Sequence, residues 1–372
     1  MFDRTITWDI INNCFLWKWI IIYWPRQVGK TTITKQIQKK FTDKNIYYAT
    51  GDDLDIQQLW EPRISVLSNI VSGYDIVIID EAQRIKNIWL VLKLLIDTYP
   101  EKQFIATWSS SFDLANKVSE PLTWRTYIYH LYPLSLWEIY NGVFTKSILE
   151  QRMTFWSYPD VINTNNINPS QYLKNMVDNY LYKDILWYDG IQKYDIIIKL
   201  LQALALQIWN EFSILEIANT IWSNKDTVTK YINILEQAFI IKTLSPLHTN
   251  QRREIKSHKK VYFWDLWIRN ALINNFNPMH IRNDVWQLWE NLCFIERTKY
   301  ISYNHILHNQ YFWREASWLE IDYIEQYNDK YDCREFKYST QKWWSLPSTF
   351  ATKYICNKFE VIRNDNINNM LK

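Results

Sequence analysis

The chain has 372 residues, enough for two or three domains, and 48% hydrophobic with 22% charged residues is normal for a globular protein with buried cores. Its net charge of +3 is too small to indicate a nucleic-acid partner by itself. The four cysteines form no C-x-x-C pair, which argues for a reducing compartment and against a zinc site. The N-terminus has no signal pattern and no apolar run could span a bilayer, so we expect a cytoplasmic protein.

A short loop between a predicted strand and a predicted helix has the pattern of a phosphate-binding loop. The apolar run Ile20–Tyr23 precedes it and the periodic segment Thr32–Phe41 follows. In such a loop, backbone N–H groups and the helix N-terminus hold the phosphates of a nucleotide. Lys30 would contact the terminal phosphates, and Thr31 would bind Mg²⁺. The predicted nucleotide-binding residues here are Trp24, Pro25, Arg26, Gln27, Val28, Gly29, Lys30, Thr31 and Thr32.

This loop departs from the usual pattern at one position. The pattern is G-x-x-x-x-G-K-[ST], and Trp24 stands where the first glycine is expected. The alternative interpretation is an ordinary strand-to-helix turn in which Gly-Lys-Thr occurs by chance. The acidic strand that follows along the chain favours the nucleotide site.

Two acidic residues end a predicted buried strand. After a strand predicted over Asn45–Ala49, the segment Tyr74–Ile79 is apolar and β-branched, and Asp80 and Glu81 follow it. A continuous apolar run that ends in two acids indicates a parallel strand with carboxylates at its C-terminal edge. Asp80 would bind Mg²⁺, and Glu81 would orient and deprotonate the attacking water. Solvated acids at a strand end are the alternative.

Polar residues also follow the next predicted strand. A helix predicted over 90–98 leads to a strand over 103–107, which ends at Thr107 with Ser109 just beyond. Their hydroxyls would face the γ-phosphate, although serines also favour turns. Arg125 precedes a further strand and would stabilise transition-state charge, in cis or across a subunit interface. A surface arginine is the alternative.

Four segments of the chain resemble a large prokaryotic group of AAA-type ATPases: residues 25–32, 79–85, 107–111 and 131–138. In that group an N-terminal ATPase domain precedes a C-terminal domain long labelled as of unknown function. The resemblance implies an α/β P-loop NTPase fold of AAA type with ATP and Mg²⁺ as cofactors. It implies ATP binding by Lys30 and Thr31, with Asp80 and Glu81 as the Walker B pair. It implies no known substrate.

The middle of the chain has the element order of a winged helix-turn-helix. After a helical bridge and an apolar helix over 196–209, a capping box from Ser213 to Glu216 begins a short helix. A turn at 221–223 leads to a second helix with apolar residues at i, i+3, i+4 and i+7, and 239–244 reads as a strand. Such a module binds DNA or, in other proteins, only protein.

Basic and hydroxyl side chains on the second helix, and a basic segment beyond it, are the candidates for DNA contact. The lysines would touch phosphates, and the threonines would reach base edges. A solvated basic loop is the alternative. The candidates are Lys225, Thr227, Thr229 and Lys230 on the helix, and Arg252, Arg253, Lys256, Lys259 and Lys260 in segment 252–260.

The last third of the chain carries an arrangement typical of a restriction-endonuclease-like core. Asp322 lies on a predicted strand, and Glu335-x-Lys337 lies on the next, so Glu335 and Lys337 share a face. Two carboxylates would hold Mg²⁺ while the lysine polarises water or phosphate, and Glu290 would complete the set from a helix. The C-terminal domain of the resembled family is similar to this fold. An inactive binding module, or an ordinary exposed strand face, is the alternative.

These features predict four segments: an ATPase core (1–140), a helical bridge (141–195), a winged helix (196–260) and an α/β restriction-endonuclease-like domain (261–372). The favoured function is ATP hydrolysis that drives a domain rearrangement, with a homo-oligomer also compatible. The second is a nucleic-acid-binding or cleaving module in which ATP acts as a switch. The third is a non-catalytic scaffold with an inactive loop.

The chain has 21 tryptophans and only 5 glycines. We predict that many of these tryptophans are glycines encoded by UGA, as in some A/T-rich bacterial genomes. Trp24 falls where the loop must approach phosphate closely, and Trp108, Trp124 and Trp222 fall in predicted tight turns. The family resemblance also implies glycine at Trp89, Trp267 and Trp318, whereas Trp289 and Trp313 read as genuine tryptophan. The alternative is a tryptophan-rich protein with an impaired loop.

Overall fold

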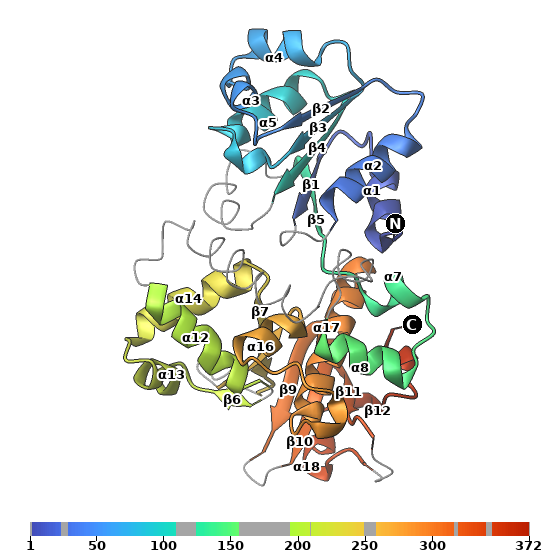
Figure 1. Cartoon of the computed structure of the whole chain (residues 1–372). Helices are drawn as coiled ribbons and strands as arrows, with labels where there is room; N and C mark the ends of the chain where they lie inside the picture. The colour runs from blue at the N-terminus through green and yellow to red at the C-terminus, as the bar shows by residue number, and fades with distance from the viewer. Residues whose placement is uncertain are drawn as a thin grey trace. The chain divides into compact units, whose positions relative to one another are not determined.

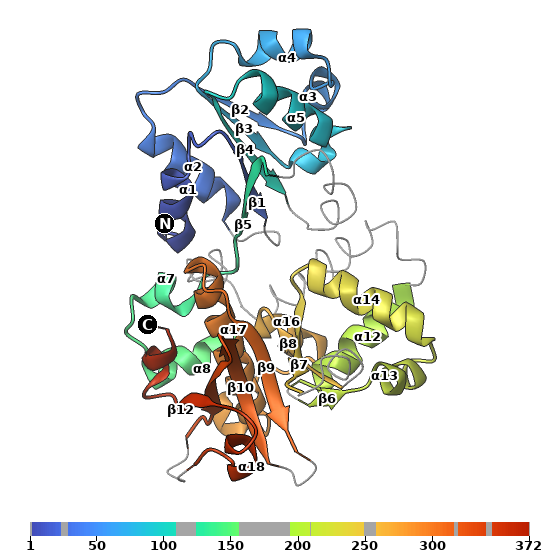
Figure 2. The ribbon, with the colours of Figure 1, turned by 180° about the vertical axis from the view of Figure 1, so that it is seen from behind.

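The computed structural model describes residues 2–23, 29–108, 124–155, 194–208, 210–248, 258–315, 319–339 and 344–371. The chain forms two compact units, Met1–Leu134 and Ser135–Lys372, which Figures 1 and 2 show from opposite sides. No helix in the described ranges is both long and apolar enough to cross a membrane. Several predicted site residues lie outside the described residues: Trp24, Pro25, Arg26, Gln27, Val28, Ser109, Arg252, Arg253 and Lys256, together with the side chains of Lys30 and Thr31.

The first unit is built on a five-stranded sheet with the order β2-β3-β4-β1-β5, and every pairing in it is parallel. In Figure 1, α1 and α2 lie on one side of this sheet, and α3, α4 and α5 lie on the other. The strands are β1 (Trp19–Tyr23), β2 (Ile46–Thr50), β3 (Ile76–Asp80), β4 (Gln103–Trp108) and β5 (Thr126–His130). The helices are α1 (Thr5–Asn12), α2 (Lys30–Lys40), α3 (Leu54–Leu59), α4 (Ile64–Val71), η1 (Ala82–Arg84) and α5 (Ile88–Thr98).

The three central strands β1, β3 and β4 are buried along nearly all their length because helices cover both faces of the sheet. Val77 and Ile79 of β3 pack in one core with residues of α4 and α5. Side chains alternate along a strand, so Ile78 and Asp80 point to the other face. Asp80 is the last residue of β3, which places its carboxylate at the C-terminal edge of the sheet.

The second unit is built on a seven-stranded sheet with the order β12-β11-β10-β9-β7-β8-β6. Strands β7 and β9 pair in parallel and join its two halves, with Ser245 opposite Tyr311. The strands are β6 (Glu211–Phe212), β7 (Ile241–Pro246), β8 (Lys259–Phe263), β9 (Asn309–Arg314), β10 (Glu320–Tyr327), β11 (Lys330–Phe336) and β12 (Cys356–Ile362). The helices are α7 (Leu136–Tyr140), α8 (Lys146–Thr154), α12 (Tyr194–Leu206), α13 (Ile214–Thr220), α14 (Lys225–Gln237), α16 (Leu266–Leu272), η3 (Met279–Ile281), α17 (Val285–Tyr303), α18 (Ser348–Ala351) and η4 (Ile367–Met370).

This continuous sheet corrects the predicted boundary between residues 260 and 261. That boundary falls inside β8, which pairs with β6 on one side and β7 on the other. The strands of the predicted winged helix therefore belong to the same sheet as the strands of the C-terminal segment. The sequence reading missed β8 because its two lysines resembled the end of a basic loop.

Among the residues that the structure describes, three tryptophans have left-handed backbone conformations: φ is 58° at Trp17, 70° at Trp124 and 56° at Trp222. Their side chains are 73%, 88% and 91% exposed, so no packing compensates for the strained backbone. The positive φ predicted at Trp124 and Trp222 is confirmed. The turn predicted at Trp108 is wrong, because this residue ends β4 and its buried ring stacks on Trp89 with centroids 4.7 Å apart.

Candidate functional site

Helix α2 begins directly after the predicted phosphate-binding loop. Gly29 is its N-cap and has φ 97°, a left-handed conformation that glycine adopts without strain. The carbonyl of Gly29 accepts the N–H groups of Thr32 and Ile33 at 3.1 and 3.3 Å, which starts the helical hydrogen bonding. The first N–H groups of a helix have no partner within it and carry a partial positive charge, so the N-terminus of α2 suits a phosphate group.

The carboxylate of Asp80 is held from both sides by hydroxyl groups. Thr107 of β4 donates to its Oδ1, and Tyr48 of β2 donates to its Oδ2 at 2.9 Å. The Thr107 oxygen also accepts the backbone N–H of Glu81 at 3.0 Å. The structure therefore brings together three predicted site residues, Asp80, Glu81 and Thr107, and adds Tyr48, which lies inside the second predicted strand and has no predicted role. The signal that the sequence offered for this role was a tyrosine hydroxyl two residues before the C-terminal end of β2.

Glu81 follows β3 in a left-handed conformation, with φ 50° and ψ 44°. Such a conformation is strained for a residue other than glycine, and strain of this kind often marks functional sites. Its carboxylate accepts a hydrogen bond from Gln83 Nε2 at 2.5 Å. A water-orienting carboxylate must be held in this way if it is to act on a substrate without reorganisation.

Gly51 supports the same turn from the neighbouring strand. Its N–H donates to the carbonyl of Asp80 at 2.7 Å, and a Cβ added at Gly51 would lie 2.3 Å from the carbonyl oxygen of Glu81. Only glycine allows this close approach. The sequence reading assigned Gly51 to a turn and missed this role, because the approaching backbone lies thirty residues away in the chain.

Arg125 does not join this site within one chain. Its carbonyl accepts the N–H of Trp19 at 2.8 Å, so it lies at the start of β5, beside the start of β1. In a parallel sheet that edge is opposite the C-terminal edge where Asp80 lies. Its side chain forms an ion pair with Asp97 at 2.8 Å. The predicted catalytic role in cis is wrong, because β5 runs parallel to β1, so a residue that precedes β5 lies at the N-terminal edge of the sheet.

Four predicted residues of the C-terminal segment gather around β10 and β11. Lys337 Nζ lies 2.9 Å from Asp322 Oδ2 and 2.6 Å from Glu335 Oε2. Asp322 Oδ2 also accepts the N–H of Phe336 at 2.8 Å. Glu290 of α17 joins through charge interactions with Asp322.

The buried carboxylates of this cluster differ in their proton affinity. Burial and the charge of Asp322 raise the pKa of Glu335 to about 9. Burial also raises the pKa of Glu290 to about 7, although Lys260 opposes the shift. Burial would raise the pKa of Asp322 too, but the charges of Lys337 and Lys260 lower it below its ordinary value. Asp322 is therefore the most acidic carboxylate of the cluster, and Glu335 holds its proton most strongly.

Lys260 belongs to this buried cluster and not to a DNA-binding surface. Its side chain is fully buried, and Nζ lies 2.9 Å from Glu290 Oε1 and 2.5 Å from Glu320 Oε1. Tyr262 donates to the same Glu290 oxygen at 2.7 Å. The predicted phosphate contact by Lys260 is wrong, because the alternation of β8 turns this lysine inward.

The DNA-contact candidates on α14 lie where the sequence reading expects a second helix. Lys225 and Lys230 are exposed. Thr229 donates its hydroxyl to the carbonyl of Lys225 at 2.8 Å, and the N–H of Thr227 bonds to the Asn224 cap at 2.7 Å. Of these four candidates, the two lysines are the ones whose side chains are exposed to solvent. Lys259, at the start of β8, is half-buried.

The predicted metal sites fit the described residues unequally. Each Asp80 oxygen holds one hydroxyl donor and keeps lone pairs for a hydrated cation, so the first unit fits Mg²⁺. Within the described ranges, no group of three or more His, Cys, Asp or Glu side chains is arranged to hold a metal. Asp322 and Glu335 offer only two carboxylates, both already bonded to Lys337.

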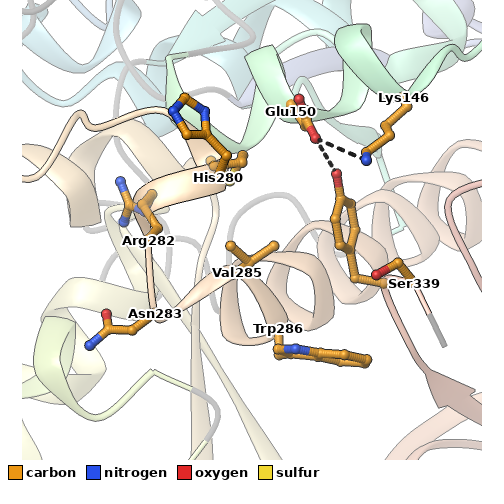
Figure 3. A pocket seen from close by; sticks show the side chains of 10 residues that line it. Lys146, Glu150, His280, Arg282, Asn283, Val285, Trp286 and Ser339 are labelled. Atoms are coloured by element: carbon orange, nitrogen blue, oxygen red, sulfur yellow. Dashed lines mark hydrogen bonds and ion pairs between the residues drawn. The ribbon is translucent and has the colours of Figure 1, made fainter.

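A separate pocket of about 320 Å³ lies in the second unit (Figure 3). Glu150 on its wall accepts the hydroxyl of Tyr338 at 2.6 Å and lies 3.9 Å from Lys146. None of the predicted site residues lines this pocket. Its lining residues are Lys146, Glu150, Met279, His280, Arg282, Asn283, Val285, Trp286, Tyr338 and Ser339.

Comparison with known families supports the interpretation of the first unit. Residues 17–140 match the AAA domain family. The match and the parallel sheet together support an AAA-type ATPase that binds nucleotide. Residues 146–279 match a domain of unknown function (DUF8612), which assigns no activity to the second unit.

The proteins that match by sequence are remote, and each is named as an uncharacterised protein. A protein of Mycobacterium tuberculosis is 21% identical over 318 residues, covering 82% of this chain and 67% of that protein. One from Methanocaldococcus jannaschii is 24% identical over 294 residues, covering 68% of this chain and 62% of that protein.

Among solved structures, a RuvB mutant from Thermogota maritima has TM-score 0.33 at 16% identity, covering 69% of this chain and 96% of RuvB. AMPPCP-bound DnaA from Aquifex aeolicus has TM-score 0.31 at 17% identity, covering 62% and 86%. Scores this low establish no shared fold.

Proposed function

We propose that this protein binds ATP with Mg²⁺ in its first unit, hydrolyses it, and uses hydrolysis to drive a domain rearrangement in the cytoplasm. The observation that carries the proposal is the edge where β3 and β4 end. Asp80, Glu81 and Thr107 are tied together there by hydrogen bonds. The strand β1, which precedes the predicted phosphate-binding loop in the sequence, runs parallel beside β4, and the left-handed Gly29 begins α2.

Each residue has a distinct role in this proposal. The N-terminus of α2 and Lys30 hold the β- and γ-phosphates, and Thr31 and Asp80 hold the hydrated Mg²⁺. Glu81 orients the attacking water and takes its proton. Thr107 fixes Asp80 and Glu81 relative to each other, because one hydroxyl bonds to both. Bound Mg²⁺ would supply charge neutralisation at the phosphates.

Two substitutions separate binding from chemistry. Lys30→Ala removes the charge at the phosphates and should abolish nucleotide binding. Glu81→Gln should keep binding and slow hydrolysis by about two orders of magnitude, because the water loses its base. Both are measured by nucleotide affinity and phosphate release in the Trp24→Gly background, where the loop has its expected glycine. ATP turnover by Glu81→Gln at the parent rate would contradict the role of Glu81.

A second candidate function concerns the second unit. Asp322 of β10, Glu335 of β11 and Lys337, which directly follows β11, lie within ion-pair distance of one another, and this arrangement supports the restriction-endonuclease-like interpretation. Helices α13 and α14, followed by the antiparallel β7–β8 pair, are compatible with a winged helix that binds DNA. We therefore keep a nucleic-acid-binding or Mg²⁺-dependent nuclease module as the alternative, with ATP as its switch.

Cleavage by this second site has a direct test. Asp322→Ala and Lys337→Ala should each stop Mg²⁺-dependent cleavage of DNA and leave ATP hydrolysis intact. The substrates are single-stranded and supercoiled double-stranded DNA, with Lys225→Ala as a variant that weakens only DNA contact. If the purified parent nicks neither substrate, the nuclease alternative is removed.

A further inference from the structure

We infer that Tyr48 is a positioning residue of the nucleotide site, and that it holds Asp80 in the orientation that a hydrated Mg²⁺ requires. This inference rests on the proposed ATP and Mg²⁺ binding of the first unit. It adds a side chain from β2, a strand to which neither the phosphate-loop pattern nor the acidic strand end draws attention.

The sheet register places Tyr48 on the correct face. β2 and β3 run parallel, with Thr50 opposite Asp80 and Tyr48 opposite Ile78. Residues two apart on a strand share a face, so Tyr48 and Asp80 point the same way. The phenol therefore reaches diagonally to the carboxylate, and its hydroxyl oxygen lies 2.9 Å from Asp80 Oδ2.

Packing alone does not explain the position of the Tyr48 side chain. Tyr48 lies on an edge strand, its side chain is 43% exposed, and it belongs to neither described hydrophobic core. A phenol is protonated at neutral pH, so Tyr48 can donate this hydrogen bond to the carboxylate.

Tyr48 and Thr107 together determine the orientation of Asp80. They approach from β2 and β4, on the two sides of β3, and each takes one carboxylate oxygen. With both oxygens held, the carboxylate cannot rotate, and its remaining lone pairs point in fixed directions. Without the Tyr48 donor, one Asp80 oxygen would be free and the carboxylate could rotate. Hydrated Mg²⁺ would then have to fix the orientation of the carboxylate when it binds, which weakens its binding.

Tyr48→Phe tests this inference, and the neighbouring tyrosine supplies a matched control. Tyr47 points to the opposite face, where its ring contacts Trp60 and Tyr74 with centroids 6.2 and 5.1 Å apart. In the Trp24→Gly background, binding of a fluorescent non-hydrolysable ATP analogue is titrated with Mg²⁺. Tyr48→Phe should raise the Mg²⁺ concentration for half-maximal binding about tenfold, the effect expected for a hydrogen bond to a charged group. Tyr47→Phe should leave it unchanged.

The outcomes distinguish this inference from the proposed function. Nucleotide affinity in EDTA and the thermal midpoint should be equal in the two variants, because only the response to Mg²⁺ depends on Asp80. If the parent binds the analogue with Mg²⁺ and Tyr48→Phe responds to Mg²⁺ as the parent does, the inference is wrong and the proposed function stands. If the parent itself binds no nucleotide, both are wrong.

Discussion

At the residue scale, Gly51 offers a sharp test of the turn that carries Glu81. Gly51→Ala would bring a Cβ to 2.3 Å from the Glu81 carbonyl oxygen, so the turn after β3 must move. We expect a loss of about 1–3 kcal/mol in the free energy of unfolding and a larger proportional loss in ATP hydrolysis than in binding. Urea unfolding and phosphate release measure the two effects.

Gly73→Ala is the matched control for this substitution. An added Cβ at Gly73 meets no atom within 4 Å, and alanine should be tolerated there. Equal activities of the two alanine variants would mean that the position of Glu81 does not depend on its contact with Gly51.

The tryptophans with left-handed backbones belong to the same scale. Tryptophan in this conformation is strained by about 1–2 kcal/mol, and glycine is not. Trp124→Gly and Trp222→Gly should therefore stabilise the chain by about 1 kcal/mol each, whereas Trp289→Gly should destabilise it by at least about 3 kcal/mol because that ring is fully buried. Thermal unfolding measures all three.

The coding sequence gives an independent check of the same hypothesis. We expect UGA at codons 24, 124 and 222, with UGG at codons 289 and 313. The structure does not favour glycine equally everywhere, because Trp89 and Trp108 are buried and stack on each other. UGG at codons 24, 124 and 222 would end the hypothesis.

At the element scale, a buried charge network joins α17, β10 and β11. The Glu325 carboxylate of β10 accepts two hydrogen bonds from Arg297 of α17, at 2.6 and 2.9 Å, and one from Arg334 of β11 at 2.7 Å. It also lies 2.9 Å from His308 Nδ1. Burial would raise the pKa of Glu325, but the hydrogen bond from Arg297 and the charge of Arg334 lower it to about 2. The network thus depends on an ionised Glu325.

This network predicts a defined pH dependence. A glutamate whose folded pKa is lowered stabilises the fold above its unfolded pKa, and this contribution is lost as the pH falls from about 4.5 to about 2. The loss is about 3 kcal/mol at most. Glu325→Gln should be less stable at pH 7 and should lack this part of the slope in urea unfolding measured against pH. Parallel curves for parent and variant would contradict the assignment.

The elements that the sequence predicted best are those with a local signal. The apolar runs that became β1, β3 and β4 were located within two residues, since a buried parallel strand is apolar along its length. The roles of Tyr48, Gly51 and Lys260 were missed because each depends on a partner about thirty residues or more away: Asp80, Glu81 and Glu290. Asp322 and Lys337 were found because adjacent strands bring near neighbours together.

At the scale of the whole molecule, the shared seven-stranded sheet links the two halves of the second unit. Lys260, on the β8 strand that follows α13 and α14, inserts its charge between Glu290 and Glu320. A ligand that moves the β7–β8 pair would therefore disturb the carboxylate cluster.

If the ATPase serves a nucleic-acid function, double-stranded DNA should change the rate of ATP hydrolysis, and Lys225→Ala with Lys230→Ala should reduce that change.

The central claim is that the first unit binds and hydrolyses ATP. The most direct measurement is phosphate release from ATP by the purified chain carrying Trp24→Gly, with Mg²⁺ and with EDTA, beside the same chain carrying Glu81→Gln. We predict Mg²⁺-dependent turnover in the first chain, and tight ATP binding with little turnover in the second. Absence of both ATP binding and turnover in the Trp24→Gly chain would contradict the account.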